Sequence, residues 1–356
     1  MFYRWWQIDD EGRRRVWRLY GWFSGLMLCG SFFGAVTWVS RMMDRVIIFR
    51  GNELVSTSNN PTAIAEGLSL WASSRHWIAV FYVSYAIDFL FLSVTRLLVL
   101  DRMLDFAAAG SMTKFRVVGG RIVVAAVLLG NATGLAASIA AAVQYKQAAD
   151  TFYTASMFYS VNNTQDGRDQ WNSAQAQNEL AFSIASKQSF CEVIVLLIIV
   201  FMFVVVGVMC TRRINTGLLA ANSQGNAASA TAAADSRTLR LQIVGTTGVV
   251  FVASLLRSVV STMLAVVGLL QESGKSWITC PTGRNLCNPS CYNVFSHIHT
   301  WQNYTPQFLA TVVLISSPLA LLVALWGMTS KLTLQLMKSN RQQTPALSLQ
   351  TPRFRV

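Results

Sequence analysis

"LQIVGTTGVVFVASLLRSVVSTMLAVVGLL", residues 241–270, is an apolar run in which Arg257 is the one charged residue. A helix needs about 20 consecutive apolar residues to cross a bilayer, and buried helices of soluble proteins are usually shorter. The whole chain of 356 residues is 53% hydrophobic and 13% charged, which is about half the charged fraction of an average soluble domain. The sequence therefore predicts an all-α, polytopic helical membrane bundle.

Similar runs recur along the chain, and we expect six transmembrane helices. Residues 1–19 precede them and carry charges and aromatic side chains where a signal peptide has its apolar core, so we expect a cytosolic, interfacial N-terminus. The membrane domain is then 20–327, with spans over 20–40, 77–100, 122–142, 189–211, 241–270 and 305–327.

The distribution of Lys and Arg predicts the orientation of the bundle. The two terminal segments and the even-numbered loops carry 18 of these residues, and the odd-numbered loops carry nine. Because cytosolic segments are enriched in Lys and Arg, we expect both termini in the cytosol. Arg41, Arg45 and Arg50 are an exception, since they follow the first span on the outer side. The excess of basic residues predicts attraction to the anionic lipid of the inner leaflet, and no nucleic-acid partner.

Three outer loops are expected, over 41–76, 143–188 and 271–304, and they face the extracellular space or a lumen. Asn162 and Asn303 begin sequons there and are candidate glycosylation sites. Four cysteines on this side allow two disulfides in three possible pairings, or a zinc site with His297 and His299 as neighbours. We expect disulfides and no metal, on the argument of an oxidising compartment. The candidate cysteines are Cys191, Cys280, Cys287 and Cys291.

The segments between spans differ in composition. Residues 143–188 are rich in Ala and Gln, which predicts that spans three and four continue beyond the membrane as paired helices; the alternative is a disordered glycosylated loop. The inner loop 211–240 contains a low-complexity stretch and is expected to be a flexible linker. The basic, polar tail 328–356 is expected to be disordered. Either inner segment is a candidate contact for a cytosolic protein partner.

Two charged residues lie deep in their predicted spans. Asp88 is near the middle of the second span, and Arg257 is near the middle of the fifth. A lone charge at that depth costs about 3 kcal/mol on insertion scales, so we expect Asp88 and Arg257 to pair inside the bundle. Glu192 is assigned to the outer end of the fourth span. Hydrogen bonds to the pair are expected from Asn131, Ser258, Ser261, Ser316 and Ser317.

The expected pair has two interpretations of equal weight: it fixes the register of the helices, or it marks a binding or conducting site. Motifs of catalytic sites are missing from the sequence, and all three histidines are expected at the outer face, so we expect no enzyme and no cofactor.

In its long spans, outer cysteines and basic inner tail the chain resembles the serpentine receptors, which have seven spans. The first hypothesis is therefore a receptor-like or scaffolding protein of the plasma membrane or endomembranes. The alternative is a channel or solute transporter that uses the polar cluster around Asp88 and Arg257. A polar stripe or wet cavity that reaches these residues favours transport, whereas a dry, fully paired core favours the scaffold. The oligomeric state is not predicted.

Overall fold

We describe the fold from a computed structural model of the full chain. The residues that it describes are 11–57, 60–107, 119–161, 163–222, 228–273, 293–294, 297–298, 300–301, 305, 311–312 and 319–323.

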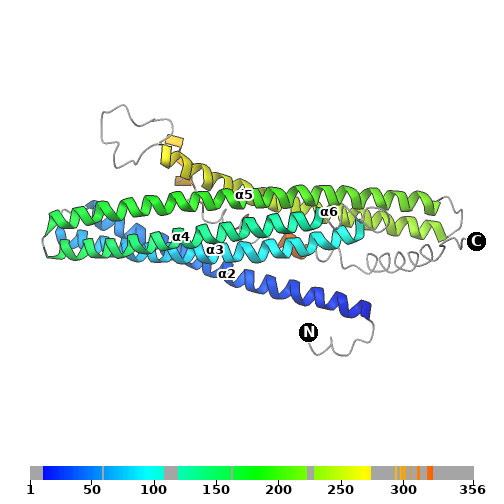
Figure 1. Cartoon of the computed structure of the whole chain (residues 1–356), viewed down its shortest axis with the longest axis horizontal. Coiled ribbons are helices and arrows are strands. Elements are labelled where there is room, and N and C mark those ends of the chain that lie inside the picture. The colour runs from blue at the N-terminus through cyan, green and yellow to red at the C-terminus, as the bar shows by residue number, and fades with distance from the viewer. Residues whose placement is uncertain are drawn as a thin grey trace, which may run out of the picture. The chain divides into compact units, whose positions relative to one another are not determined.

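Long α-helices account for nearly all of these residues. They are α2 (Glu11–Thr57), α3 (Pro61–Ala107), α4 (Gly120–Ser160), α5 (Thr164–Asn222) and α6 (Ala228–Ser273) (Figure 1). Each contains a segment long and apolar enough to cross a membrane, so the described residues provide five candidate spans. The chain is thus a helical, integral membrane protein. Of the expected sixth span, 305–327, the structure describes residues 305, 311–312 and 319–323.

The chain consists of two compact units, and each helix from α3 to α6 contributes to both. Unit 1 comprises residues 1–94, 128–195 and 257–315, and unit 2 comprises residues 95–127, 196–256 and 316–356.

In unit 1, α2 and α3 form an antiparallel pair, with contacts to α3 from Gly30 to Gly51 of α2. Close to their connection, a Cβ atom on Gly51 would lie 2.6 Å from the ring of Trp71, so the two helices approach each other closely there. Further along, Thr37 Oγ1 lies 2.9 Å from Ser84 Oγ. Small residues at such positions allow helix backbones to come together, which is how membrane helices pack in the absence of water.

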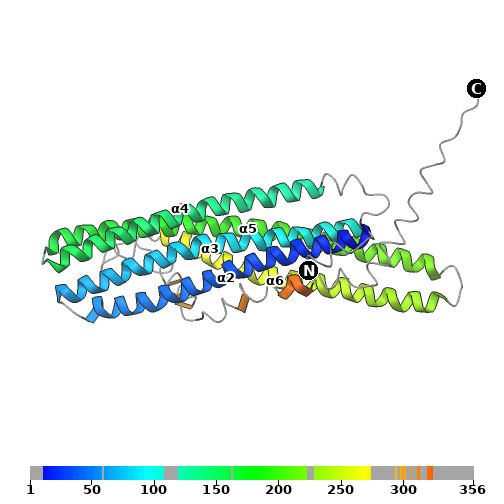
Figure 2. The ribbon, with the colours of Figure 1, turned by 90° about the horizontal axis from the view of Figure 1, so that it is seen from below.

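The second pair of unit 1 is α4 and the first half of α5, which run side by side in both views (Figures 1 and 2). Near their connection the Thr151 hydroxyl donates to Gln177 at 3.0 Å. A Cβ atom on Gly130 would meet Val195 Cγ2 at 2.4 Å, which fixes the level of α5 against α4. These helices therefore continue as a pair beyond their apolar runs, and the predicted helical structure of 143–188 is confirmed.

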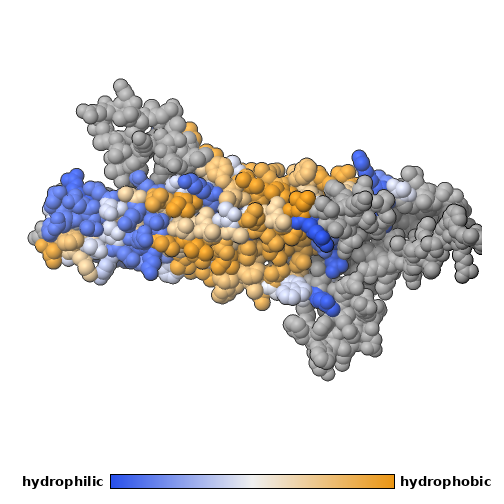
Figure 3. Space-filling model, viewed as in Figure 1, coloured by the Kyte–Doolittle hydropathy of each residue, from blue (hydrophilic) through white to orange (hydrophobic). Residues whose placement is uncertain are grey.

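Two clusters of buried side chains join the pairs in unit 1. One gathers alanines and aromatic rings near the helix connections, and its Trp71 ring contacts Phe152 edge to face at 5.7 Å. The other is built around Tyr145, whose ring stacks on Tyr82 with centroids 5.4 Å apart. At the end of unit 1 where α4 meets α5, hydrophilic residues cover the visible surface, and hydrophobic residues cover the helices farther along (Figure 3).

Unit 2 contains the remaining parts of α3, α5 and α6 and the start of α4. Cys210 on α5 is buried and lies 3.5 Å from the carbonyl oxygen of Met103 on α3. A Cβ atom on Gly207 would meet Thr247 of α6 at 3.0 Å. Close helix contacts of this kind are packing features, and they explain the small residue at position 207.

Two segments that we expected outside the spans are more helical than the sequence suggested. Residues 41–57 continue α2, and α3 begins at Pro61, so most of the 41–76 segment is helix. In the expected flexible linker 211–240, α5 continues to Asn222 and α6 starts at Ala228. The composition explains the second difference, because alanine has the highest helix propensity of all residues and the segment is rich in it.

Candidate functional site

A charged cluster lies inside unit 1, where α3, α5 and α6 meet. Arg257 of α6 donates from its Nε to Glu192 Oε1 of α5 at 2.9 Å, and the two side chains are 0% and 2% exposed. Taking ions out of water costs several kcal/mol each, and a direct hydrogen bond between opposite charges offsets part of that cost. The bond therefore explains how α6 holds an arginine within its apolar run.

Aromatic side chains of α3 complete the surroundings of this ion pair. The Tyr85 hydroxyl lies 2.8 and 2.7 Å from the two oxygens of Glu192 and donates to the carboxylate. The guanidinium carbon of Arg257 lies 5.4 Å from the ring centre of Tyr85 and 5.0 Å from that of Phe89. Cations over aromatic faces are attracted by the ring quadrupole, most strongly where water is excluded. Glu192, Arg257 and the rings of Tyr85 and Phe89 thus form one group of side chains in mutual contact.

Asp88 is the second acid of the cluster and lies farther from the guanidinium than Glu192 does. Its Oδ2 lies 3.9 Å from Arg257 Nη1, which is an electrostatic contact beyond hydrogen-bond length. On its other side the carboxylate faces α2, where a Cβ atom on Gly30 would lie 3.6 Å from Asp88 Oδ1. The described residues thus bring two carboxyl groups and one guanidinium together. With all three ionised, the cluster has one negative charge in excess.

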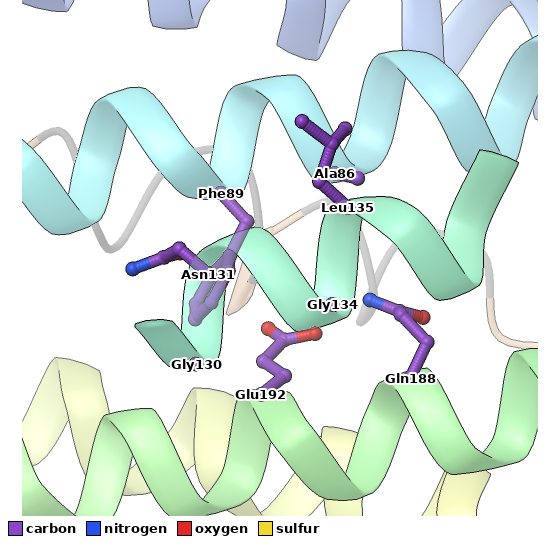
Figure 4. A pocket seen from close by; sticks show the side chains of 8 residues that line it. All are labelled: Ala86, Phe89, Gly130, Asn131, Gly134, Leu135, Gln188 and Glu192. Atoms are coloured by element: carbon purple, nitrogen blue, oxygen red, sulfur yellow. The ribbon is translucent and has the colours of Figure 1, made fainter. Parts of the chain in front are cut away.

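A small pocket lies beside the cluster, between α3, α4 and α5. Figure 4 shows the carboxylate of Glu192 reaching into it from α5, with Gln188 one turn away and Asn131 on α4. Its other lining residues are apolar or glycine, and it has room for about one water molecule.

Buried hydroxyl groups connect the region of Asp88 with the helix ends of unit 1. On α3, Ser84 is one turn from Asp88, and its hydroxyl lies 2.9 Å from that of Thr37 on α2. Ser40 follows on the same face of α2, and the next turn brings Asp44, which accepts a hydrogen bond from Ser74 at 2.6 Å. The interface of α2 with α3 therefore has a polar stripe that leads toward Asp88.

The structure brings together most of the residues that the sequence singled out. Asp88 and Arg257 lie side by side, Asn131 lines the pocket, and Ser258 and Ser261 are buried on α6 next to Arg257. Ser316 and Ser317 lie outside the described residues.

Glu192 was misassigned. It is the closest partner of Arg257, although the sequence placed it at the outer end of its span. The sequence held only a weak indication of this role, because Glu192 directly precedes the most apolar run of the chain. How far α5 is shifted along its own axis relative to α6 is set by helix packing, which the sequence does not show. Tyr85 and the hydroxyl groups of α2 carry no charge and had no such signal.

The expected outer sites are mostly untested. Cys191 is a free thiol on α5, directly before Glu192 and near Gly134 of α4, so it lies at the level of the charged cluster. Its expected disulfide partners Cys280, Cys287 and Cys291 lie outside the described residues, as do the sequon residues Asn162 and Asn303.

Comparison of the chain with protein families, with curated proteins and with solved structures finds no match.

Proposed function

We propose that this chain is a membrane transport protein in which Asp88 takes up and releases a proton during transport. The observation that carries the proposal is a second buried carboxylate beside one guanidinium: Asp88 lies 3.9 Å from Arg257, whose Nε bonds Glu192 at 2.9 Å. An excess charge at membrane depth is costly, and a proton on Asp88 removes it.

Two further features support a proton as the transported or coupling ion. The space beside Glu192 admits about one water molecule, which is too small for a hydrated metal ion. Hydroxyl groups of Thr37 and Ser84 lie one turn from Asp88 and are able to accept and donate protons in turn. Of the charged groups in the cluster, Arg257 opposes the protonation of Asp88, whereas the negative charge of Glu192 favours it.

The test is proton flux into vesicles that contain the purified protein and a trapped pH-sensitive dye. We expect Asp88→Asn to abolish the flux while the protein folds normally, because the amide keeps the shape and cannot be ionised. Asp169→Asn, the same change at an exposed position of α5, is the matched control and should leave the flux unchanged. Equal flux with the wild type and Asp88→Asn contradicts the proposal, and uptake of sodium or potassium in place of protons contradicts the choice of ion.

A receptor-like or scaffolding protein is the second candidate. It is favoured by the complete burial of Arg257 and by its direct bond to Glu192, which is what a static brace requires. In this case the inner segments 211–240 and 328–356 bind a cytosolic partner. The vesicle experiment separates the candidates, because a scaffold carries no flux.

The topology that we propose with either function has six spans and cytosolic termini. It is supported by the excess of Lys and Arg in the even-numbered loops and terminal segments. The membrane that we propose is the plasma membrane or an endomembrane. Cysteine labelling from each side tests it. Glycan attachment at Asn162 or Asn303 and disulfides among the outer cysteines require those loops to be extracellular or lumenal.

A further inference from the structure

A second charged cluster in unit 1 contains more arginine than acid. Asp44 of α2 is 1% exposed, and its Oδ2 lies 3.4 Å from Arg41 Nη1 and 3.5 Å from Arg45 Nε. The other oxygen of Asp44 accepts a hydrogen bond from Ser74 of α3 at 2.6 Å. The carboxylate of Asp44 thus contacts two guanidinium groups and one hydroxyl group.

Arg75 of α3 adds a third positive charge. It follows Ser74, and the charges of Arg41 and Arg75 both act against that of Arg45, so both groups are close enough to repel the Arg45 guanidinium. The buried Nε of Arg75 has no hydrogen-bond partner among the described residues. With Asp44 counted, two positive charges remain in excess.

The arginines are accessible, unlike the cluster at Asp88. The side chains of Arg41 and Arg45 are 24% and 32% exposed. Arg41 is also held in place by the ring of Phe81, whose centre is 5.3 Å from the guanidinium carbon. A partly exposed group of fixed guanidinium forks is suited to oxoanions, which these forks bind through two parallel hydrogen bonds.

The position of the cluster along α3 matches a lipid headgroup. At the helical rise, Arg75 is about 20 Å along the axis from Asp88. The hydrocarbon core extends about 15 Å to each side of the bilayer centre, and the headgroups lie in the next few ångströms. If Asp88 is near the centre, as its position in the apolar run of α3 indicates, the arginines are at headgroup level.

We infer that Arg41, Arg45 and Arg75 form a binding site for an anionic phosphate group between α2 and α3, with Asp44 and Ser74 as its brace. The phosphate belongs to a phospholipid at the membrane surface or to a soluble phosphate compound. A site of this kind explains why Arg41 and Arg45 depart from the charge asymmetry of the other loops. The inference is independent of proton uptake at Asp88.

The test uses the full-length protein in detergent, titrated in one arm with a short-chain phosphatidic acid and in the other with inorganic phosphate. The double variant Arg41→Gln/Arg45→Gln should weaken binding roughly 30-fold, and Arg75→Gln roughly fivefold, from the contribution of each arginine near an anionic surface. Arg50→Gln is the matched control, since Arg50 is an exposed arginine of the same helix outside the cluster, and it should leave the affinity unchanged.

Arg75→Gln keeps all three contacts of Asp44, with Arg41, Arg45 and Ser74, and therefore tests the site even if the double variant does not fold. Loss of phosphatidic acid binding in these variants supports a lipid site, and loss of phosphate binding alone supports a soluble ligand. Equal affinities of the wild type and Arg75→Gln for both probes overturn the inference, as does an equal loss in Arg50→Gln.

Discussion

Glu192 accepts a hydrogen bond from Arg257 at 2.9 Å, and both side chains are almost completely buried. This bond joins α5 to α6 at the level where Asp88 of α3 also approaches the guanidinium. The three residues come from segments far apart in the sequence, so the cluster exists only once these helices have assembled. A substitution in the cluster is therefore expected to change both proton uptake and the stability of the assembled helices.

The first prediction concerns the unequal importance of the two charges in this bond. Arg257→Gln removes the base that both buried acids contact and should cost about 3–5 kcal/mol of stability, whereas Glu192→Gln leaves Arg257 with Asp88 and should cost less. In the double variant part of the loss should be recovered, with a coupling energy of about 1 kcal/mol or more. Unfolding in mixed micelles measures these differences. Strictly additive losses would show that the two side chains do not interact.

The second prediction concerns the hydroxyl group of Tyr85. Tyr85→Phe removes the hydrogen bond to Glu192 and keeps the ring beside Arg257. We expect a loss of about 1 kcal/mol, between the value for bonds to charged groups and the smaller average for bonds within membranes. Tyr153→Phe, at an exposed tyrosine of α4, is the control for the same assay. A loss no larger than that of the control contradicts the role of the hydroxyl.

The third prediction concerns the polar stripe between α2 and α3. Thr37→Val keeps the shape of the side chain and removes the hydroxyl group that contacts Ser84. If protons reach Asp88 along this stripe, the flux should fall at least severalfold while stability changes little. Thr133→Val replaces an exposed hydroxyl of α4 and should have no effect. Unchanged flux in Thr37→Val would direct the search for a proton path to another interface.

How much the sequence predicts depends on whether a feature is local. Helices, their extension beyond the apolar runs and the pairing of Asp88 with Arg257 follow from composition and from the cost of a lone charge in lipid. The position of Glu192 beside Arg257 does not follow from the sequence, because the sequence shows only how far each residue lies from the ends of its own apolar run. The level of α5 is fixed by packing, for example by the contact of Gly130 with Val195, and neither residue signals this contact in the sequence.

The polar residues of α2 show the same limit. Thr37, Ser40 and Asp44 recur at helical spacing, but the sequence alone gave no reason to face them toward α3. Their partners Ser74 and Ser84 become visible only when the antiparallel register of the two helices is known.

The fourth prediction tests that register. Gly51→Ala places a methyl group 2.6 Å from the ring of Trp71 and 3.2 Å from the carbonyl oxygen of Gly67, and it should cost about 1–3 kcal/mol. Gly25→Ala, on the same helix, meets no atom within 4 Å among the described residues and should be neutral or stabilising by up to about 1 kcal/mol. Thermal unfolding of the two variants is the measurement. Similar effects at both positions would mean that α2 and α3 do not meet at Gly51.

The most direct test of proton uptake at Asp88 is infrared difference spectroscopy of the reconstituted protein across a pH step. We expect a carbonyl stretching band of a protonated carboxylic acid in the wild type, and its loss in Asp88→Asn but not in Asp169→Asn. The same band in the wild type and in Asp88→Asn would contradict the account, because the proton would then reside on another group.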